Sequence, residues 1–363
     1  HHVFQPLLYQ VATAMLSPAQ IAFPIRSMFK SKKNIRVLIG NILKVDLESQ
    51  YVQPKRSKER FYYDYLVIAA GARHSYFGKK EWEAHAWGLK TIRDALKIRE
   101  RMLYSFEKAE RSKSKKKQQK YSTFVIVGAG PTGVEMAGAI AEVTRQSIAQ
   151  DFTEVDSRLS RIILLEGSNK ILNGYPDKLS ERAYTDLVQM GVEIRLNAFV
   201  SNVTKDGVYI NDDFIETENI IWAAGNIASP LIKNVTHHIN KMGQALVNDD
   251  FSIKETNNVF CIGDCAYLVD KQNQVVPAVA QGAMQSGEFV ANQIINDIKG
   301  KPRDSFSYFN KGAMATIGRS RAVADISGYK FSGFFAWLLW GVVHIFFLVD
   351  FRNKLYVFFD WIT

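Results

Sequence analysis

The stretch Phe124-Val-Ile-Val-Gly128-Ala-Gly130-Pro-Thr-Gly133 decides the fold class of this chain. Its four apolar residues predict a buried strand, and the apolar positions from Val134 to Val143 recur at helical spacing. A second apolar segment, 161–165, predicts another strand and ends at Glu166. Strand, glycine turn, helix and strand together form a βαβ unit, which is typical of an α/β fold with a parallel sheet.

The three glycines of this stretch have separate physical roles. Gly128 permits a tight turn, Gly130 lets the backbone approach a pyrophosphate, and Gly133 lets helix and strand pack closely. The amide groups at the start of the helix then face the phosphates. Because the strand, the helix and the acidic strand end are all present, the stretch predicts dinucleotide binding. A purely structural turn is the alternative.

Glu166 lies where the second strand of the βαβ unit ends. A carboxylate at this place accepts hydrogen bonds from the adenosine ribose hydroxyls and repels a 2′-phosphate, so we expect NADH rather than NADPH. An exposed acid without a ligand is the alternative.

Three further apolar segments end in small residues. Tyr65–Gly71 and Ile220–Gly225 both end in Ala-Ala-Gly, and Asn258–Asp264 ends in Gly-Asp. The repetition predicts two related nucleotide-binding domains, one interrupted by the other. We also expect a helix over 91–109 and strands over 35–39, 42–47, 62–69, 192–196, 208–210 and 219–223.

The length and composition of the chain are those of a globular protein with two domains. With 363 residues, 47% hydrophobic and 23% charged, the chain is long enough for two domains and is neither disordered nor polytopic. The formal charge of +10 is concentrated in 108–120, which we expect to be an exposed linker; a patch for anionic lipid or nucleic acid is the alternative. The two cysteines, Cys261 and Cys265, can form neither a metal set nor a disulfide framework, so we expect no metal and a reducing compartment.

Aromatic and aliphatic residues dominate 331–362, and their apolar run is broken by His344 and ended by Asp350 and Arg352. The apolar run is too short for a membrane span, which needs about 20 apolar residues. Its Trp and Phe content predicts a helix that lies in the membrane interface. A buried core or dimer helix is the alternative, and His344 is expected to be a tolerated polar residue rather than a ligand.

Taken together, these landmarks resemble the type II, non-proton-pumping NADH:quinone oxidoreductases. The resemblance covers the segment from His1 to Ala12, Gly128–Gly138, Val259–Ala266, the paired glutamines of Pro277–Gln285, and Lys311–Asp325 with the aromatic tail. The family begins with another GxGxxG turn for FAD, and this chain starts after that point. We therefore expect the native N-terminus to be missing.

The resemblance implies FAD and NADH as cofactors. It places Asp264, Gly263, Ala70 and Gly71 at FAD. Ala224 and Gly225, which end the apolar strand 220–223, are also expected to bind a dinucleotide cofactor. It also places Glu135 near nicotinamide and flavin, although the helix dipole alone favours an acid there. Gln281 and Gln285, four residues apart, share a helix face and are expected to border the quinone; ordinary amide packing is the alternative.

The expected fold is α/β with two Rossmann-like domains, an FAD domain interrupted by an inserted NADH domain, plus a C-terminal membrane-contact helical tail. We expect the FAD domain at 1–90 and 231–325, the NADH domain at 91–230 and the tail at 326–363. The expected partners are ubiquinone or menaquinone and a membrane surface, without nucleic acid, in a possible homodimer. A peripheral position is expected in a respiratory chain, on the cytoplasmic face of a bacterial inner membrane or on the mitochondrial inner membrane.

Three rival functions are weighed against this one. A flavin disulfide reductase needs a redox cysteine pair near the flavin ring, where this chain has Phe4–Tyr9, and a sulfide:quinone oxidoreductase fails for the same reason. A non-catalytic flavoprotein that senses nucleotides and binds a partner through its basic face would not couple NADH oxidation to quinone reduction.

Overall fold

The computed structural model describes residues 1–149 and 151–362, which fall into two compact units. Unit 1 comprises His1–Ile35, Tyr76–Gly225 and Gly312–Thr363, and unit 2 comprises Arg36–Ser75 and Asn226–Lys311. The chain therefore passes between the units several times. Both units combine strands and helices, so the predicted α/β class is confirmed.

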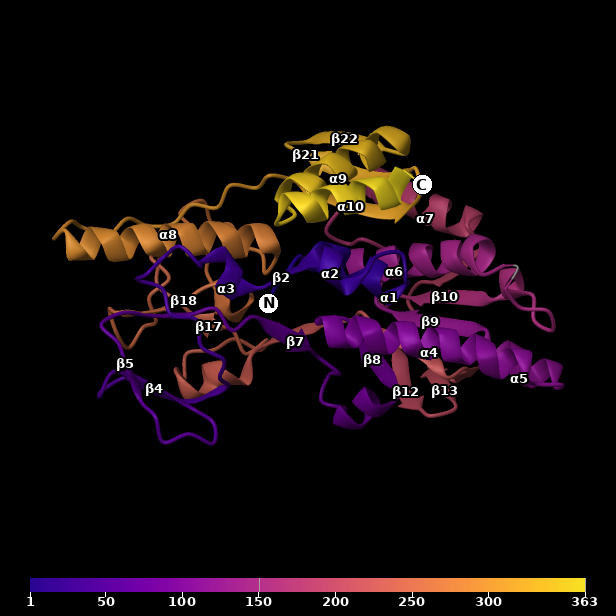
Figure 1. The fold of residues 1–363 in the computed structure, drawn as a ribbon, viewed down its shortest axis with the longest axis horizontal. Coiled ribbons are helices and arrows are strands. Elements are labelled where there is room, and N and C mark those ends of the chain that lie inside the picture. The colour runs from indigo at the N-terminus through magenta and orange to yellow at the C-terminus, as the bar shows by residue number, and fades with distance from the viewer. Residues whose placement is uncertain (150, 363) are drawn as a thin grey trace. The chain divides into compact units, whose positions relative to one another are not determined.

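A five-stranded parallel sheet forms the centre of unit 1 (Figure 1). Its order is β11 (Val192–Arg195), β10 (Arg161–Leu165), β9 (Thr123–Val127), β15 (Asn219–Trp222) and β8 (Ala86–Gly88). The first four strands follow the order of half a doubly wound sheet. The predicted βαβ unit is confirmed as β9, α6 (Pro131–Glu142) and β10.

The two faces of this sheet bury alternate side chains against different layers. Phe124 and Ile126 of β9 pack on the core shared with α1 (Leu8–Ala12), α4 (Ile92–Glu110), α6 and α7 (Asp177–Gln189). Val125 and Val127 point to the other face, which is covered by β12 (Val200–Thr204), β13 (Gly207–Ile210) and β14 (Asp213–Glu216). Burial on both faces explains why the parallel strands are continuously apolar.

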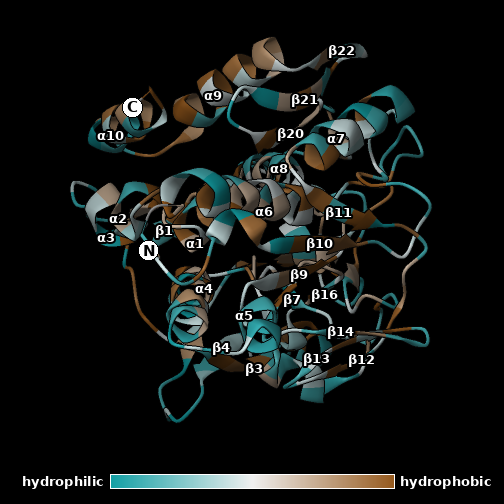
Figure 2. Ribbon diagram, turned by 90° about the vertical axis from the view of Figure 1, so that its right-hand side faces the viewer, coloured by the Kyte–Doolittle hydropathy of each residue, from teal (hydrophilic) through white to brown (hydrophobic). Residues whose placement is uncertain are grey.

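A second sheet of unit 1, β20 (Ala313–Gly318), β21 (Arg321–Ile326) and β22 (Tyr329–Ser332), is antiparallel and lies against α6. A Cβ added to Gly138 of α6 would lie 1.7 Å from the carbonyl oxygen of Ile317, so helix and sheet are in backbone contact. The helix α9 (Phe334–Phe347) lies beside β21 (Figure 2). Its Ala336 packs against Ala322 and Ala324 of that strand.

The predicted tail 326–363, whose last residue lies outside the described part, contains β22 and two helices, α9 and α10 (Phe351–Ile362). Trp340 and Val357 are buried, whereas Phe335, Phe346 and Phe351 are 76%, 70% and 72% exposed. Both helices thus bury one face in unit 1 and leave an apolar face uncovered. Among the residues that the structure describes, no helix has the length and apolarity needed to cross a membrane.

Unit 2 contains the parallel pair β6 (Leu66–Ile68) and β18 (Val259–Cys261), and the long helix α8 (Ala280–Ile298). The core of unit 2 contains Ile68, Phe251 and Phe260. The remaining strands of this unit are β3 (Ile42–Asp46), β4 (Tyr51–Pro54), β5 (Phe61–Tyr62), β7 (Ala72–His74), β16 (Asn226–Ala228), β17 (Ala245–Leu246) and β19 (Ala266–Tyr267).

The N-terminal segment of unit 1 also contains the short elements β1 (His2–Val3), α2 (Pro18–Ile21), β2 (Ala22–Phe23) and α3 (Ile25–Met28).

The predicted strand at 35–39 is wrong. These residues have no assigned strand, and Ile39 is 97% exposed. An alternating apolar pattern forms a strand only where a neighbouring strand accepts its hydrogen bonds, and within the described ranges none pairs with this segment.

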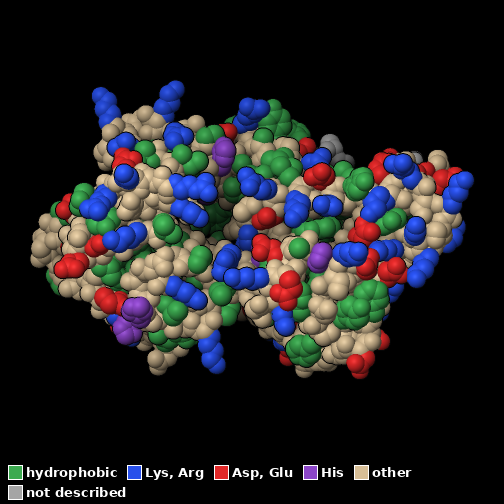
Figure 3. Space-filling view, turned by 90° about the horizontal axis from the view of Figure 1, so that it is seen from below, with side chains coloured by type: hydrophobic (Ala, Val, Ile, Leu, Met, Phe, Trp, Pro, Cys, Tyr) green, Lys and Arg blue, Asp and Glu red, His purple; other side chains and the backbone are tan. Residues whose placement is uncertain are grey.

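The predicted linker at 108–120 is also wrong in part. The segment is mostly exposed, but it contains the end of α4 and a further helix, α5 (Lys115–Tyr121), whose N-terminus is capped by Ser114. Lys108 pairs with Glu218, and Lys120 pairs with Asp206 at 2.9 Å. Figure 3 likewise shows Lys and Arg side chains intermixed with Asp and Glu.

The predicted domain limits differ from the limits of the compact units. Residues 1–35 and 312–325 were expected in the FAD domain, and they belong to the unit that contains the five-stranded sheet. Since the units are defined by contacts and the predicted domains by cofactors, the cofactor assignment stays a prediction.

Candidate functional site

Three neighbouring strands of unit 1 bring the predicted NADH residues together. Gly128 follows β9, Glu166 follows β10 on one side, and Ala224 and Gly225 follow β15 on the other. The amide of Gly128 donates to the carbonyl oxygen of Leu165 at 2.8 Å, and Ala223 donates to Val127 at 2.8 Å. The carboxyl ends of parallel strands are where open α/β sheets bind ligands.

The glycines of the turn have the conformations that their predicted roles require. Gly128 has a φ of +97°, and an added Cβ would lie 2.8 Å from the backbone of Ala224. A Cβ on Gly133 would lie 1.8 Å from the carbonyl oxygen of Gly128, so this position packs helix on strand. Gly130, in contrast, faces open space, with no described heavy atom within 4 Å of an added Cβ. The turn therefore fits a dinucleotide, whose pyrophosphate would approach Gly130.

Glu166 is held in place at the edge of this turn. One carboxylate oxygen accepts from the amide of Ala129 at 2.7 Å, and the other accepts from the amide and hydroxyl of Ser168 at 3.0 and 2.6 Å. A carboxylate has about four acceptor positions, so the side chain can still receive a ribose hydroxyl. Its predicted role in cofactor selection stays a prediction.

Unit 2 brings the predicted FAD residues together in a similar way. Ala70 and Gly71 follow β6, and Gly263 and Asp264 follow β18, the strand that pairs with β6. The amide of Ile262 donates to the carbonyl oxygen of Ile68 at 3.0 Å, which holds the two strand ends side by side.

The two glycines of this candidate FAD site, Gly71 and Gly263, have different surroundings. Gly71 has a φ of +63° and opens into free space, as a cofactor cradle requires. Gly263 has a φ of +67°, but an added Cβ would lie 3.2 Å from the Cβ of Ala283 on α8. Gly71 therefore fits FAD directly, and Gly263 is needed for the close approach of α8.

Gln281 and Gln285 on α8 both hold the backbone of the segment that follows this helix. The amide group of Gln285 donates to the carbonyl oxygen of Phe309 at 2.9 Å and accepts from its N–H at 3.0 Å. The carbonyl oxygen of Gln281 accepts from the amide of Lys311 at 3.2 Å. Both side chains thus hold backbone, and their predicted position at the quinone stays a prediction.

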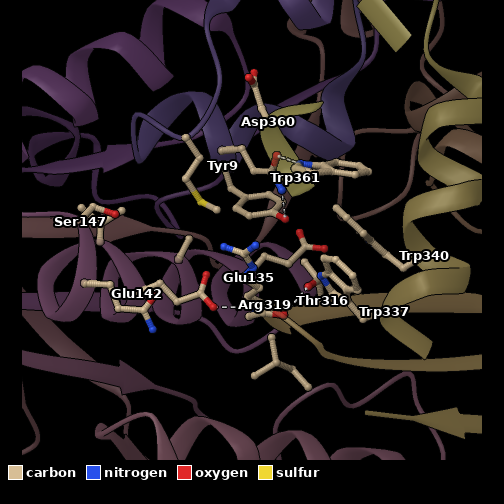
Figure 4. A pocket seen from close by; sticks show the side chains of 17 residues that line it. Tyr9, Glu135, Glu142, Ser147, Thr316, Arg319, Trp337, Trp340, Asp360 and Trp361 are labelled. Carbon is tan, nitrogen blue, oxygen red and sulfur yellow. Dashed lines mark hydrogen bonds between the residues drawn. The ribbon is translucent and has the colours of Figure 1, made fainter. Parts of the chain in front are cut away.

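Glu135 lines a cavity of about 140 Å³ inside unit 1. Figure 4 shows it among side chains of α1, α6, β20, α9 and α10. Tyr9 and the three tryptophans Trp337, Trp340 and Trp361 form aromatic walls. The indole N–H of Trp361 donates to Gln10 at 2.9 Å, so α10 is fixed across the opening from α1.

Two carboxyl groups of this cavity are poorly solvated. Burial raises the pKa of Glu135 to about 8, although the amide of Thr316 opposes the shift. Burial also raises the pKa of Glu142, which accepts a hydrogen bond from the amide of Arg319. At neutral pH, Glu135 therefore carries a proton and can donate it.

Trp340 presents a buried polar atom at the cavity. Its side chain is 1% exposed, and no described residue offers a hydrogen-bond partner to its indole nitrogen. His344 stacks on this ring at 4.2 Å and bonds the carbonyl oxygen of Trp340 at 2.7 Å. Burial lowers the pKa of His344 to about 4, so it is neutral. A buried unsatisfied donor beside a cavity is a feature that an acceptor group of a ligand would satisfy.

Sequence reasoning identified one residue of this cavity, Glu135, and missed the rest. Tyr9 lies more than 300 residues before Trp340 and Trp361 in the sequence, so no local pattern joins it to them. Only the aromatic enrichment of 331–362 indicated that the tail could contribute.

Comparison with known proteins first defines the class. Residues 1–287 match the family model described as pyridine nucleotide-disulphide oxidoreductase, and residues 310–363 match the NDH2 C-terminal domain. A solved structure of NDH2 from Plasmodium falciparum in complex with NADH has a TM-score of 0.90 at 24% identity, covering 99% of this chain and 90% of that one. That likeness shows the shared fold.

Curated relatives define the family within this class. The chain is 41% identical over 375 residues to the type II NADH:quinone oxidoreductase Ndh of Mycobacterium tuberculosis, covering 99% of this chain and 80% of the relative. It is also 41% identical over 376 residues to NdhA of the same organism, covering 99% and 79%. The chain belongs to the type II NADH:quinone oxidoreductase family, and the predicted resemblance is confirmed. A sulfide:quinone oxidoreductase from Aquifex aeolicus shares the fold, with a TM-score of 0.76 at 16% identity.

Proposed function

We propose that this chain oxidises NADH and passes two electrons to a quinone, with FAD as cofactor and without proton pumping, in a respiratory chain. The observation that carries the proposal is the turn at Gly130, which is open to a pyrophosphate and is bordered by Glu166. The relatives named as NADH:quinone oxidoreductases support the same activity.

Different residues around the turn bind different parts of NADH. The backbone of Gly130 and the start of α6 bind the pyrophosphate, Glu166 binds the adenosine ribose, and Ala224 with Gly225 borders the far side. Ala70, Gly71, Gly263 and Asp264 would hold FAD. When bound, FAD supplies a hydride acceptor and a two-electron donor.

Reduction of a quinone consumes protons as well as electrons, and the cavity beside Glu135 can supply one. The raised pKa of Glu135 keeps this group protonated at neutral pH, and the indole N–H of Trp340 can donate to a carbonyl oxygen. Independently of this cavity, Gln281 and Gln285 of unit 2 are proposed to border the quinone, with ordinary amide packing as the alternative; in the structure they hold the backbone of Phe309 and Lys311.

The uncovered faces of α9 and α10 support membrane contact. Phe335, Phe346 and Phe351 are exposed although they are large and apolar, and such patches mark interaction surfaces. We propose a peripheral position on a bacterial inner membrane, with the mitochondrial inner membrane as the alternative, and a homodimer as a possible assembly. Quinones stay in the bilayer, so docking would bring enzyme and substrate together.

The test is a pair of half-reactions followed by stopped-flow absorbance in the full-length protein. Glu135→Gln should slow flavin reoxidation by a short-chain quinone and leave flavin reduction by NADH nearly unchanged. In the native protein, quinone reduction should fall as the pH rises through about 8, and this decline should vanish in the variant.

Glu181→Gln, an exposed change on α7, serves as the matched control. Equal slowing of both half-reactions in Glu135→Gln would assign Glu135 a structural role. No NADH oxidation in the native flavoprotein with any quinone would overturn the proposed function.

A further inference from the structure

The two cysteines of the chain lie together in unit 2, at the end of β18. The Sγ atoms of Cys261 and Cys265 are 3.5 Å apart, with Cys261 donating to Cys265. The chain reverses between them because Gly263 takes a φ of +67°. Residues four apart on an extended strand would be more than 10 Å apart, since each residue advances about 3.3 Å. The turn therefore creates the pair.

Cys265 as a thiol donates to the carbonyl oxygen of Ile262 at 3.2 Å, whereas hydrogen bonds from Cys261 and from two backbone amides favour its thiolate. The hydrogen bond from Cys261 lowers the pKa of Cys265 to about 7 against the effect of burial, and the amides of Gly71 and Ala70 add to the shift. The pKa of Cys261 is raised by the same hydrogen bond and by burial. One sulfur is thus suited to act as nucleophile and the other to remain a thiol.

Both side chains are fully buried, and Cys265 lies beside the backbone amides of Ala70 and Gly71. A small uncharged oxidant can reach this depth more easily than a bulky thiol reagent. The alternative is that both cysteines act only as small apolar core residues, which are unreactive when buried.

We propose that Cys261 and Cys265 form a redox-active dithiol that a peroxide converts into an intramolecular disulfide. The Cys265 thiolate attacks hydrogen peroxide, the O–O bond breaks, and Cys265 sulfenic acid and hydroxide form. The Cys261 thiol then attacks the sulfenic sulfur, the S–S bond forms, and water leaves with the Cys261 proton. Two thiols are oxidised while one peroxide is reduced.

The disulfide changes the turn that contains Gly263 and Asp264. The two sulfur atoms must move from 3.5 Å to about 2 Å apart, and the segment that joins them must adjust. Gly263 also donates its amide to Ser286 of α8 at 3.3 Å, so a shift of the turn strains that contact. Because Gly263 and Asp264 are proposed to hold FAD, oxidation should weaken FAD binding; this consequence rests on the proposed function.

Peptide mapping tests the disulfide without reference to activity. Trypsin cleavage after Lys254 and Lys271 releases 255–271, a single peptide that contains both cysteines. After brief peroxide treatment of the folded, FAD-loaded protein and alkylation under denaturing conditions, this peptide should be lighter by two hydrogen atoms and unalkylated. Dithiothreitol should restore two alkylation sites. If the peptide from peroxide-treated protein still carries two alkyl groups, the proposal is overturned.

Single variants separate the roles of the two sulfurs. In Cys261→Ala, peroxide should leave Cys265 as a sulfenic acid that dimedone traps, whereas in Cys265→Ala, Cys261 should stay reduced. The reverse order would contradict the assigned roles.

Equilibrium dialysis then measures FAD retention. Oxidised native protein should bind FAD roughly tenfold more weakly than reduced protein, about the loss of one hydrogen bond. The Cys261→Ala/Cys265→Ala double variant, which cannot form the bond, is the matched control and should not respond to peroxide. If the disulfide forms and the FAD affinity stays the same, the claim that oxidation weakens FAD binding is overturned, but the dithiol remains. If neither the oxidised nor the reduced protein binds FAD, the proposed function itself fails.

Discussion

The turn after β9 in unit 1 and the turn after β18 in unit 2 both follow a parallel strand, but their glycines meet different surroundings. In the first turn, Gly133 touches backbone and Gly130 faces open space. In the second, Gly263 contacts Ala283, and the open position is Gly71 on the neighbouring strand. The difference teaches that a glycine in a nucleotide-binding motif serves either packing or ligand approach, and that the direction of its absent Cβ decides which.

The largest effect is expected for Gly133→Ala. The new Cβ would lie 1.8 Å from the carbonyl oxygen of Gly128, and neither backbone can yield without moving β9 or α6. We expect a loss of about 3 kcal/mol or more in the free energy of unfolding, or no soluble protein. Thermal unfolding and soluble yield measure this. A variant with native thermal stability would show that the contact relaxes freely.

Gly130→Ala should separate binding from stability. The position is open and its φ of −70° suits alanine, so the unfolding free energy should change by less than about 1 kcal/mol, the cost of a poorer N-cap. NADH affinity should fall by roughly tenfold to a hundredfold because the methyl group occupies the place of the pyrophosphate. Titration calorimetry checks the affinity. Destabilisation as large as that of Gly133→Ala would break the comparison between the two positions.

Glu166→Gln should weaken NADH binding by several-fold and reduce the preference over NADPH. The amide can keep one of the hydrogen bonds from Ala129 and Ser168, but it lacks the charge that repels a 2′-phosphate. The measurement is the ratio of kcat/KM for the two cofactors. Ser168→Ala keeps the carboxylate and is the control, with the native ratio expected. An unchanged ratio in Glu166→Gln would assign cofactor selection to another residue.

The smallest effect is expected for Gly263→Ala, measured against Gly71→Ala. Both positions have positive φ, so each substitution should cost about 1 kcal/mol in unfolding free energy. Gly263→Ala should cost slightly more because of the 3.2 Å contact with Ala283. Gly71→Ala should instead show the larger loss of FAD affinity. Urea unfolding measures the stability of the two variants, and flavin titration measures their FAD affinity. If Gly71→Ala were the less stable variant and Gly263→Ala the weaker FAD binder, the packing role of Gly263 would be contradicted.

Several expectations from the sequence failed for one physical reason. No described strand pairs with the segment 35–39, and the linker expected at 108–120 contains a helix with ionic partners at Asp206 and Glu216. In both cases the local pattern was described correctly, but it could not show which strand or which charged residues elsewhere in the chain lie beside the segment. The cysteine pair was missed although its members are four residues apart, because the local pattern did not predict the chain reversal at Gly263 that brings the two sulfur atoms together.

The sequence by itself determined the strand–turn–helix–strand unit, the class of cofactor that it suits and the family, because these requirements are local: apolar periodicity, glycines at fixed spacing and an acid at a strand end. Only the tertiary structure decided that Gly71 faces open space while Gly263 contacts Ala283, that Gln285 holds the backbone of Phe309, and that Glu135 shares a cavity with Tyr9 and Trp340. The pKa of Glu135 belongs to the same group, since burial among distant segments sets it.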